Sequence, residues 1–321
     1  MKKIYRFAAL GLVACLSTSL FTACGKSETQ TTETSETTTT ADTETEEASE
    51  ESSVVAENTQ EENSVEETQF EETQIQVFIA ASLSSVMEEL AEIYQEKQPN
   101  VTITFNADSS GTLLTQIQEG YACDVFFSAA QKQMNTLEED GMLVDGTRHD
   151  VVNNQVCVVT YTGSDTKVTG LMNLSEASSI ALADGSVPVG KYTRQAMINA
   201  GMLTVTDGEE ASDVTTQEIS DALGVEINEC GNVSKVRTAI VEHANEVGTV
   251  YYSDTYGFED QLVILEKVSY DLTGNVIYPI AQVKNSEADE LESAAAADFV
   301  EFIASPEAKE VFDKYLFDTD L

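Results

Sequence analysis

From residue 74 onwards, short apolar runs alternate with segments whose apolar residues recur at helical spacing. The first run, 75–81 (IQVFIAA), is continuous, which is typical of a strand buried on both faces of a sheet. The segment 85–99 follows at once, has apolar residues at helical spacing and is ended by Pro99. Similar signals continue along the chain. They predict strands at 101–105, 124–130, 154–161, 179–183, 247–254, 262–270 and 275–283, and helices at 112–120, 131–143, 191–200, 232–246 and 286–317, the last with a break at Ser305-Pro306.

The alternation of strands and helices predicts an α/β fold with mainly parallel sheets. In such sheets ligands bind outside the carboxyl ends of the strands, beside the starts of helices. Here those junctions carry many small or hydroxyl-bearing residues. They are Ala81-Ser82, Asp108-Ser109-Ser110-Gly111, Pro188-Val189-Gly190, Tyr251-Tyr252-Ser253 and the helix-opening turn Gly231-Asn232-Val233-Ser234.

Junctions of this kind can form an anion site without lysine or arginine. The first N–H groups of a helix have no partner within the helix, and its N-terminus carries a partial positive charge. Serine and tyrosine hydroxyls add further donors. A pocket of donors alone suits a fully deprotonated tetrahedral oxyanion, which offers only acceptors.

Each junction taken alone also fits an ordinary structural role. Ser82 can be a simple helix N-cap, Ser109-Ser110-Gly111 a capping turn, and Tyr251 a core tyrosine bonded to backbone. Their joint presence in this order favours the binding hypothesis.

The N-terminus indicates the compartment. Positive residues precede an apolar stretch, 7–23, that is too short for a transmembrane helix, and Cys24 follows the letters FTA. We predict a lipoprotein signal peptide over 1–23 and lipidation of Cys24. Cys15 is a second candidate for the lipid, and an ordinary secretory peptide is the alternative.

Residues 24–73 contain mostly serine, threonine, glutamate and glutamine after the cysteine. With so little to bury, this segment is predicted to be a disordered acidic tether. The signal and the tether together predict an extracytoplasmic protein that is anchored to a membrane by lipid.

Other kinds of chemistry find little support in the sequence. The formal net charge of −41 argues against a nucleic-acid partner. Cys123, Cys157 and Cys230 match no metal motif, and an odd number leaves no complete disulfide framework. There is no P-loop, no dinucleotide fingerprint and no supported nucleophile–base pair. We therefore expect no catalytic residues, no cofactor and no metal site apart from an oxyanion.

An ordered set of motifs resembles the periplasmic molybdate-binding proteins of ABC transporters. The resemblance covers nearly all of 75–317 and implies a type II periplasmic-binding-protein fold, with two α/β lobes and a ligand cleft between them. The first lobe would hold 74–154 and 255–321, and the second 155–254. The matching stretches are VFIAASL, FNADSSGTLLTQI, GYACDVFFSA, NNQVCVV, VPVGKYTRQAM, NVSKVRTAIVE and GTVYYSD.

The same resemblance implies the ligands of the oxyanion. Ser82 and Ser110 would each give a hydroxyl and a backbone N–H, with Ser109 as an alternative to Ser110. Val189 and Val233 would give backbone N–H groups, and Tyr251 its phenol.

The partners implied are molybdate or tungstate, a membrane permease and its ATPase, and the protein would act as a monomer. Two alternatives remain open: a binding protein for another oxyanion such as sulfate, and a tethered surface interaction module.

Overall fold

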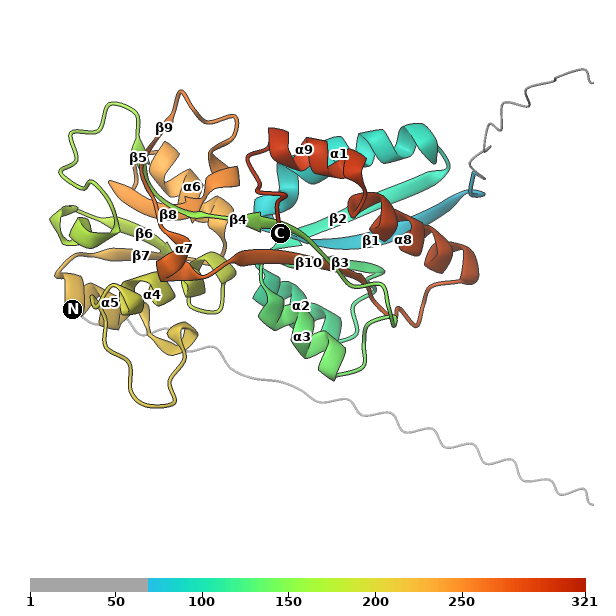
Figure 1. Cartoon of the computed structure of the whole chain (residues 1–321), viewed down its shortest axis with the longest axis horizontal. Helices are drawn as coiled ribbons and strands as arrows, with labels where there is room; N and C mark the ends of the chain where they lie inside the picture. The colour runs from blue at the N-terminus through green and yellow to red at the C-terminus, as the bar shows by residue number, and fades with distance from the viewer. Residues whose placement is uncertain (1–68) are drawn as a thin grey trace, which may run out of the picture. The chain divides into compact units, whose positions relative to one another are not determined.

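The computed structural model describes residues 69–321, which form two α/β lobes (Figure 1). The predicted signal peptide, the lipidation site Cys24 and the tether up to residue 68 lie outside the described residues. Within the described part, no helix is both long enough and apolar enough to span a membrane.

The first lobe is built on a five-stranded sheet with the strand order β2-β1-β3-β10-β4. Strand β1 pairs in parallel with β2 and β3, whereas β10 runs antiparallel to β3 and β4. The strands are β1 (Thr73–Ala80), β2 (Val101–Asp108), β3 (Val125–Phe127), β4 (His149–Asn154) and β10 (Val276–Gln282), and the helices are α1 (Ser84–Lys97), α2 (Ser110–Gln118), α3 (Gln131–Glu139), α8 (Glu290–Ile303) and α9 (Pro306–Lys314).

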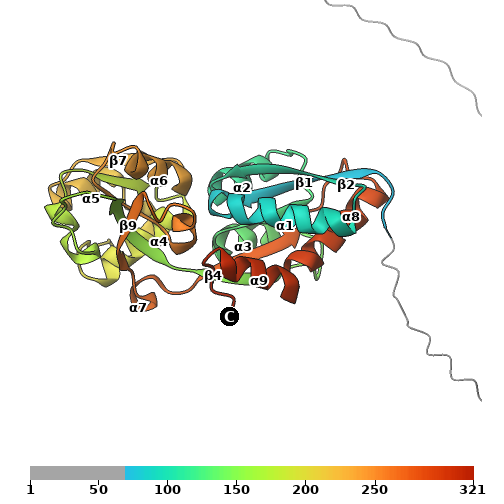
Figure 2. The same ribbon diagram turned by 90° about the horizontal axis from the view of Figure 1, so that it is seen from above.

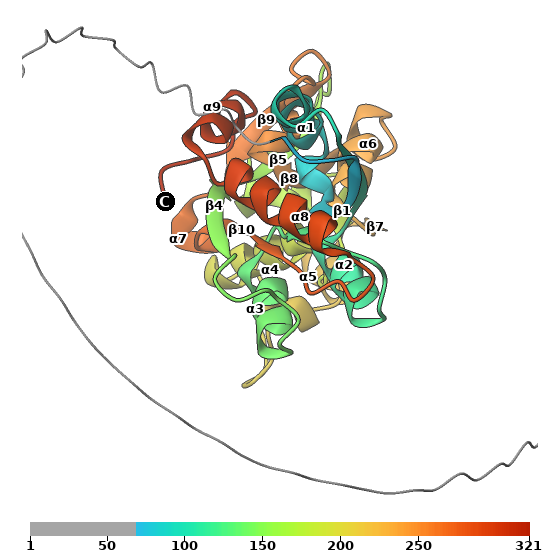
Figure 3. The same ribbon diagram turned by 90° about the vertical axis from the view of Figure 1, so that its right-hand side faces the viewer.

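Alternate residues of β1 face opposite layers of helices. Val77 and Ile79 belong to the core cluster that includes Phe299 of α8, whereas Phe78 belongs to the cluster that includes Leu113 of α2. Figure 3 shows α8 on one side of the sheet and α2 and α3 on the other. Burial on both faces explains why the first strand reads as a continuous apolar run.

The second lobe is built on a sheet with the strand order β7-β6-β8-β5-β9. Strand β6 is parallel to β7 and β8, and β5 is antiparallel to β8 and β9. The strands are β5 (Val156–Tyr161), β6 (Ile180–Ala183), β7 (Ile227–Cys230), β8 (Val247–Tyr251) and β9 (Leu262–Lys267), and the helices are α4 (Pro188–Asn199), α5 (Thr216–Leu223) and α6 (Val233–Val241).

Helices α4 and α6 cover opposite faces of β8. A side chain at Gly248 would meet Val236 of α6, whereas Thr249 accepts a hydrogen bond from Thr193 of α4 (3.0 Å between the hydroxyl oxygens). Helix α4 follows β6 and α6 follows β7, and these two strands are parallel, so the helices begin at the same end of this sheet.

Within residues 69–321 the chain crosses between the lobes twice. The first crossing joins β4 to β5 at residues 154–156, and the second joins β9 to β10 through the short helix α7 (Tyr270–Thr273). Both connections are visible between the two groups of elements in Figure 2.

The predicted two-lobed α/β fold is confirmed, with two differences in detail. The sheets are mixed, because the strands that return from the other lobe pair antiparallel. Strand β9 pairs with β5, so the second lobe extends to at least Lys267, whereas we expected the first lobe to resume at residue 255. An apolar pattern identifies a strand, but it does not say which of two sheets the strand joins.

Candidate anion-binding site

Four helix starts meet in one pocket between the lobes. The 3₁₀ turn η1 (Ala81–Leu83) and α2 come from the first lobe, and α4 and α6 come from the second. The space between these elements, open solvent included, is about 210 Å³. All five residues predicted as oxyanion ligands line it: Ser82, Ser110, Val189, Val233 and Tyr251.

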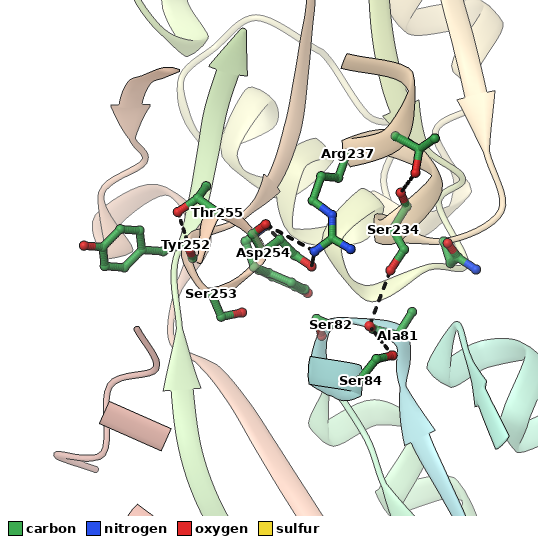
Figure 4. A network of polar contacts seen from close by, with 12 residues as sticks. Ala81, Ser82, Ser84, Ser234, Arg237, Tyr252, Ser253, Asp254 and Thr255 are labelled. Atoms are coloured by element: carbon green, nitrogen blue, oxygen red, sulfur yellow. Dashed lines mark hydrogen bonds and ion pairs between the residues drawn. The ribbon is translucent and has the colours of Figure 1, made fainter. Parts of the chain in front are cut away.

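Ser82 lies in the turn that follows the end of β1. The start of this turn has no side-chain cap among the described residues, so its first N–H groups are not used by a capping side chain. The Ser82 hydroxyl is 2.9 Å from the Tyr278 hydroxyl. Ser84 closes the turn by donating its hydroxyl to the Ala81 carbonyl at 2.9 Å (Figure 4).

The two candidate serines at the start of α2 have different surroundings. Ser109 is the N-cap: its Oγ accepts the Thr112 N–H at 3.1 Å and lies 2.8 Å from Thr112 Oγ1. Ser110 is fully buried, and its Oγ accepts the Ala129 N–H at 2.9 Å. The Ser110 hydroxyl therefore keeps its own proton for donation, whereas the Ser109 hydroxyl serves the cap.

Val189 is placed by a tight junction between β6 and α4. Pro188 occupies the first helical position, and Val189 is fully buried behind it. A Cβ atom on Gly190 would lie 2.1 Å from the Asp184 carbonyl oxygen, so only glycine allows this approach. The helix start has no side-chain cap in the described structure, which leaves the Val189 N–H without a partner inside the helix.

Arg194 holds the same junction from within the lobe. Its side chain is 1% exposed and donates to the carbonyl oxygens of Ala183 (2.7 Å), Gly190 (3.0 Å) and Val214 (2.7 Å). Sequence reasoning missed this residue, although an arginine among the apolar positions of the helix is the signal that could have revealed it.

Helix α6 brings its start against the first lobe. Asn232 is the N-cap, with its Oδ1 accepting the Lys235 N–H at 3.0 Å, and Val233 is the first helical residue. The Asn232 Nδ2 donates across the cleft to Asp108 Oδ1 at 3.0 Å. Ser234 donates its hydroxyl to the Ala81 carbonyl at 3.4 Å, a contact shown in Figure 4. Two polar contacts therefore join α6 to the first lobe at the rim of the pocket.

Tyr251 ends β8 inside the pocket. Tyr251 is 1% exposed, and within residues 69–321 its hydroxyl makes no hydrogen bond of standard length and angle, the neighbouring hydroxyl being that of Tyr278. Burial and the nearby Tyr278 raise the pKa of Tyr251 well above its usual value, so the phenol keeps its proton. A buried hydroxyl without a partner is costly, and in a pocket it indicates a missing acceptor.

The electrostatics of the pocket are set mostly by neutral groups. Among the described residues that line it there is no lysine, arginine or histidine, and the one carboxylate is Asp108. Its Oδ1 accepts the Ser109 N–H at 2.8 Å as well as the amide of Asn232. In residues 69–321 no cluster of histidine, cysteine, aspartate or glutamate could hold a metal ion. The pocket is therefore suited to an acceptor-rich ligand that needs no cation.

The buried carboxyl group of Asp254 holds the backbone of Tyr251 in place. Asp254 is 2% exposed, and its Oδ2 accepts the Tyr251 backbone N–H at 3.0 Å. Its Oδ1 makes no hydrogen bond in the described residues and lies 3.9 Å from Arg237 Nη1 of α6 (Figure 4). Burial raises the pKa of Asp254 to about 6, against the opposing charge of Arg237.

The family model that matches this chain is described as bacterial extracellular solute-binding protein, and it covers residues 75–318. The chain belongs to this family. That membership agrees with the two-lobed fold and with a pocket between the lobes.

Several relatives match over the same region. YvgL of Bacillus subtilis, provisionally named an ABC transporter substrate-binding lipoprotein, is 29% identical over 76% of this chain and 85% of its own. The molybdate-binding protein ModA of Escherichia coli is 28% identical over 76% of this chain and 88% of its own. A solved structure, a substrate-binding domain provisionally attributed to a molybdenum ABC transporter of Clostridium difficile, is 29% identical with a TM-score of 0.56, over 77% of this chain and 99% of its own.

Proposed function

We propose that this protein is the substrate-binding component of an ABC importer and that it captures molybdate, with tungstate as an equivalent ligand. The observation that carries the proposal is the buried Tyr251 hydroxyl, which faces the pocket without an acceptor. The other polar groups that face the pocket support the same conclusion, because most of them are donors.

Hydrogen-bond accounting favours a ligand that only accepts. Ser110 Oγ already accepts the Ala129 N–H, so its remaining strong interaction is donation. Val189 and Val233 lie in the first turns of their helices, where N–H groups have no intrahelical partner. A fully deprotonated tetrahedral oxyanion matches this set, and the helix dipoles stabilise its charge.

The names of the relatives favour molybdenum among the oxyanions. ModA of Escherichia coli is named for molybdate, and the Clostridium difficile domain is attributed to a molybdenum transporter. Molybdate and tungstate have the same charge and nearly the same size, so a pocket of neutral donors would accept both. Sulfate is smaller, and its exclusion would depend on the separation of the donors across the cleft.

The same proposal covers the cellular setting. Cys24 would carry a lipid that anchors the protein outside the cytoplasm, and residues after it would tether the binding domain to the membrane. The protein would act as a monomer that delivers its ligand to a permease and an ATPase, and it would have no enzymatic activity of its own.

A thermal unfolding panel tests the proposal. The purified protein is heated alone and with molybdate, tungstate, sulfate or hydrogen phosphate. Each anion is present at a concentration about one hundred times the dissociation constant expected for a true ligand. A ligand of the folded state at that excess adds about 2.7 kcal/mol, which raises the midpoint by roughly 5–10 °C. We expect shifts with molybdate and tungstate, and a shift with sulfate or hydrogen phosphate alone would overturn the assignment of the ligand.

A matched pair of serine variants links any shift to this pocket. Ser110→Ala removes a hydroxyl that faces the pocket, whereas Ser220→Ala removes a hydroxyl of α5 that lies outside the pocket and donates to the Val225 carbonyl. We expect only Ser110→Ala to weaken molybdate binding, by about 10-fold or more, since a hydrogen bond to a charged ligand contributes about 1.5–3 kcal/mol. Equal affinities of the two variants would place the ligand elsewhere.

A further inference from the structure

The hydroxyl of Ser82 is connected to a buried polar relay. Tyr278 of β10 is fully buried, and its hydroxyl lies 2.9 Å from Ser82 Oγ and 3.1 Å from Asn154 Nδ2. Neither Tyr278 nor Asn154 lines the pocket. Both can therefore affect a ligand only through the residues that do line it.

Asn154 is held in one orientation at a crossing between the lobes. Its Oδ1 accepts the Gln155 N–H at 2.9 Å, which assigns the other end of the amide as the donor. Its Nδ2 then donates to Ser253 Oγ of the second lobe at 2.8 Å and to Tyr278 Oη of the first lobe at 3.1 Å. Both amide protons are therefore used.

The ring of Tyr278 is equally constrained. It meets Phe127, Tyr251 and Phe317 edge-on, with ring centroids 6.5, 5.8 and 5.6 Å apart. Burial and the nearby charge of Asp254 raise the pKa of Tyr278 well above its usual value, so the hydroxyl keeps its proton. A fixed and protonated hydroxyl has one proton to give.

We infer that Tyr278 is a positioning residue that makes Ser82 a hydrogen-bond donor towards the pocket. Tyr278 Oη accepts a proton from Asn154 and donates its own to Ser82 Oγ, so the Ser82 proton is free to point at the ligand. The opposite direction would use the Ser82 proton on Tyr278 and turn a lone pair towards the pocket, where an oxyanion would be repelled.

This inference rests on the proposed oxyanion function and adds a source of selectivity to it. A hydrogen phosphate ion carries a proton that needs an acceptor, and a Ser82 hydroxyl fixed as a donor adds none to the Asp108 carboxylate, whose Oδ1 already accepts two hydrogen bonds. Without Tyr278 the Ser82 hydroxyl could rotate and accept that proton. The relay would therefore favour fully deprotonated oxyanions over protonated ones.

The test compares two buried tyrosines of the first lobe. Tyr278→Phe removes the relay hydroxyl, whereas Tyr94→Phe removes a hydroxyl that donates to Asp298 at 2.8 Å, away from the pocket. Calorimetric titration of the purified protein with molybdate should show about a 3- to 10-fold loss of affinity for Tyr278→Phe and none for Tyr94→Phe. The ratio of molybdate to hydrogen phosphate affinity should fall only in Tyr278→Phe.

A double-variant cycle separates positioning from general damage. In a Ser82→Ala background the relay has nothing to orient, so adding Tyr278→Phe should cause no further loss of molybdate affinity. An undiminished loss in that background, or an unchanged affinity in Tyr278→Phe alone, would overturn the relay while leaving the oxyanion function in place. Failure of the wild-type protein to bind any oxyanion would overturn both proposals.

Discussion

Replacing Tyr251 by phenylalanine should change ligand affinity and protein stability in different directions. The variant keeps the buried ring and removes only a hydroxyl that has no partner in residues 69–321. With a ligand bound, that hydroxyl would donate to a charged oxygen, an interaction that contributes about 1.5–3 kcal/mol. Molybdate affinity should therefore fall about 10- to 150-fold.

Without ligand the same change removes the energetic cost of a buried hydroxyl that has no partner. A buried polar group without a partner costs about 1–3 kcal/mol, and water that enters when the lobes separate would reduce that cost. The free energy of unfolding of Tyr251→Phe should thus be unchanged or higher than that of the wild type. Most single core substitutions lower it, so the expected sign is distinctive.

The assay pairs calorimetric titration with urea unfolding in the absence of oxyanions. Tyr94→Phe is the matched control, because it breaks an existing hydrogen bond to Asp298 and should lower stability by about 1 kcal/mol without changing affinity. Unchanged molybdate affinity in Tyr251→Phe, or a loss of stability as large as that of Tyr94→Phe, would refute the interpretation of the free hydroxyl.

Two further predictions concern a backbone donor and a buried acid. Val233→Pro removes the N–H at the first position of α6, where proline is tolerated because the preceding Asn232 is extended. Calorimetry should show at least about a 10-fold loss of molybdate affinity for this variant. Val233→Ala keeps the N–H and should bind molybdate nearly as the wild type does. The pKa of Asp254 is raised from 3.8 to about 6, so the folded protein holds this proton between about pH 4 and 6 while the unfolded chain releases it. The stability of the wild type relative to Asp254→Asn, measured by urea unfolding, should therefore fall as pH rises through that window, by about 3 kcal/mol in total.

Each of these has a clear contrary outcome. Equal affinities of the proline and alanine variants at Val233 would mean that its N–H does not contact the ligand. A stability difference between wild type and Asp254→Asn that stays constant from pH 4 to 7 would mean that the carboxyl is not protonated in the folded state within that range.

Much of the fold follows from local patterns that the sequence shows directly. The continuous apolar run that became β1 and the Ser305-Pro306 break between α8 and α9 are both present as expected. Two strands, β4 and β7, and two helices, α5 and the short α7, were missed. Strand β7 (Ile227–Cys230) is short, has exposed residues and lies at an edge of its sheet, so it lacks the apolar pattern of a central strand.

The sequence likewise predicts some residues of the site and misses others. All five residues expected from the motifs line one pocket, because each sits at a strand–helix junction that sequence patterns can locate. The supporting residues lie far away in the chain. Tyr278 reaches Ser82 across 196 positions, and Asn232 reaches Asp108 across 124, so no local spacing could pair them. Only the assembled sheets show which of these side chains lie within hydrogen-bonding distance of one another.

The most direct test of the binding site is a crystal structure of the protein grown with tungstate, whose heavy atom gives a strong anomalous signal. We expect one anomalous peak between the starts of η1, α2, α4 and α6. The oxygens around it should lie within about 2.5–3.2 Å of the hydroxyls of Ser82, Ser110 and Tyr251 and of the backbone nitrogens of Val189 and Val233. A pocket without a peak, or a peak bound to surface lysines instead, would contradict the assignment of this site.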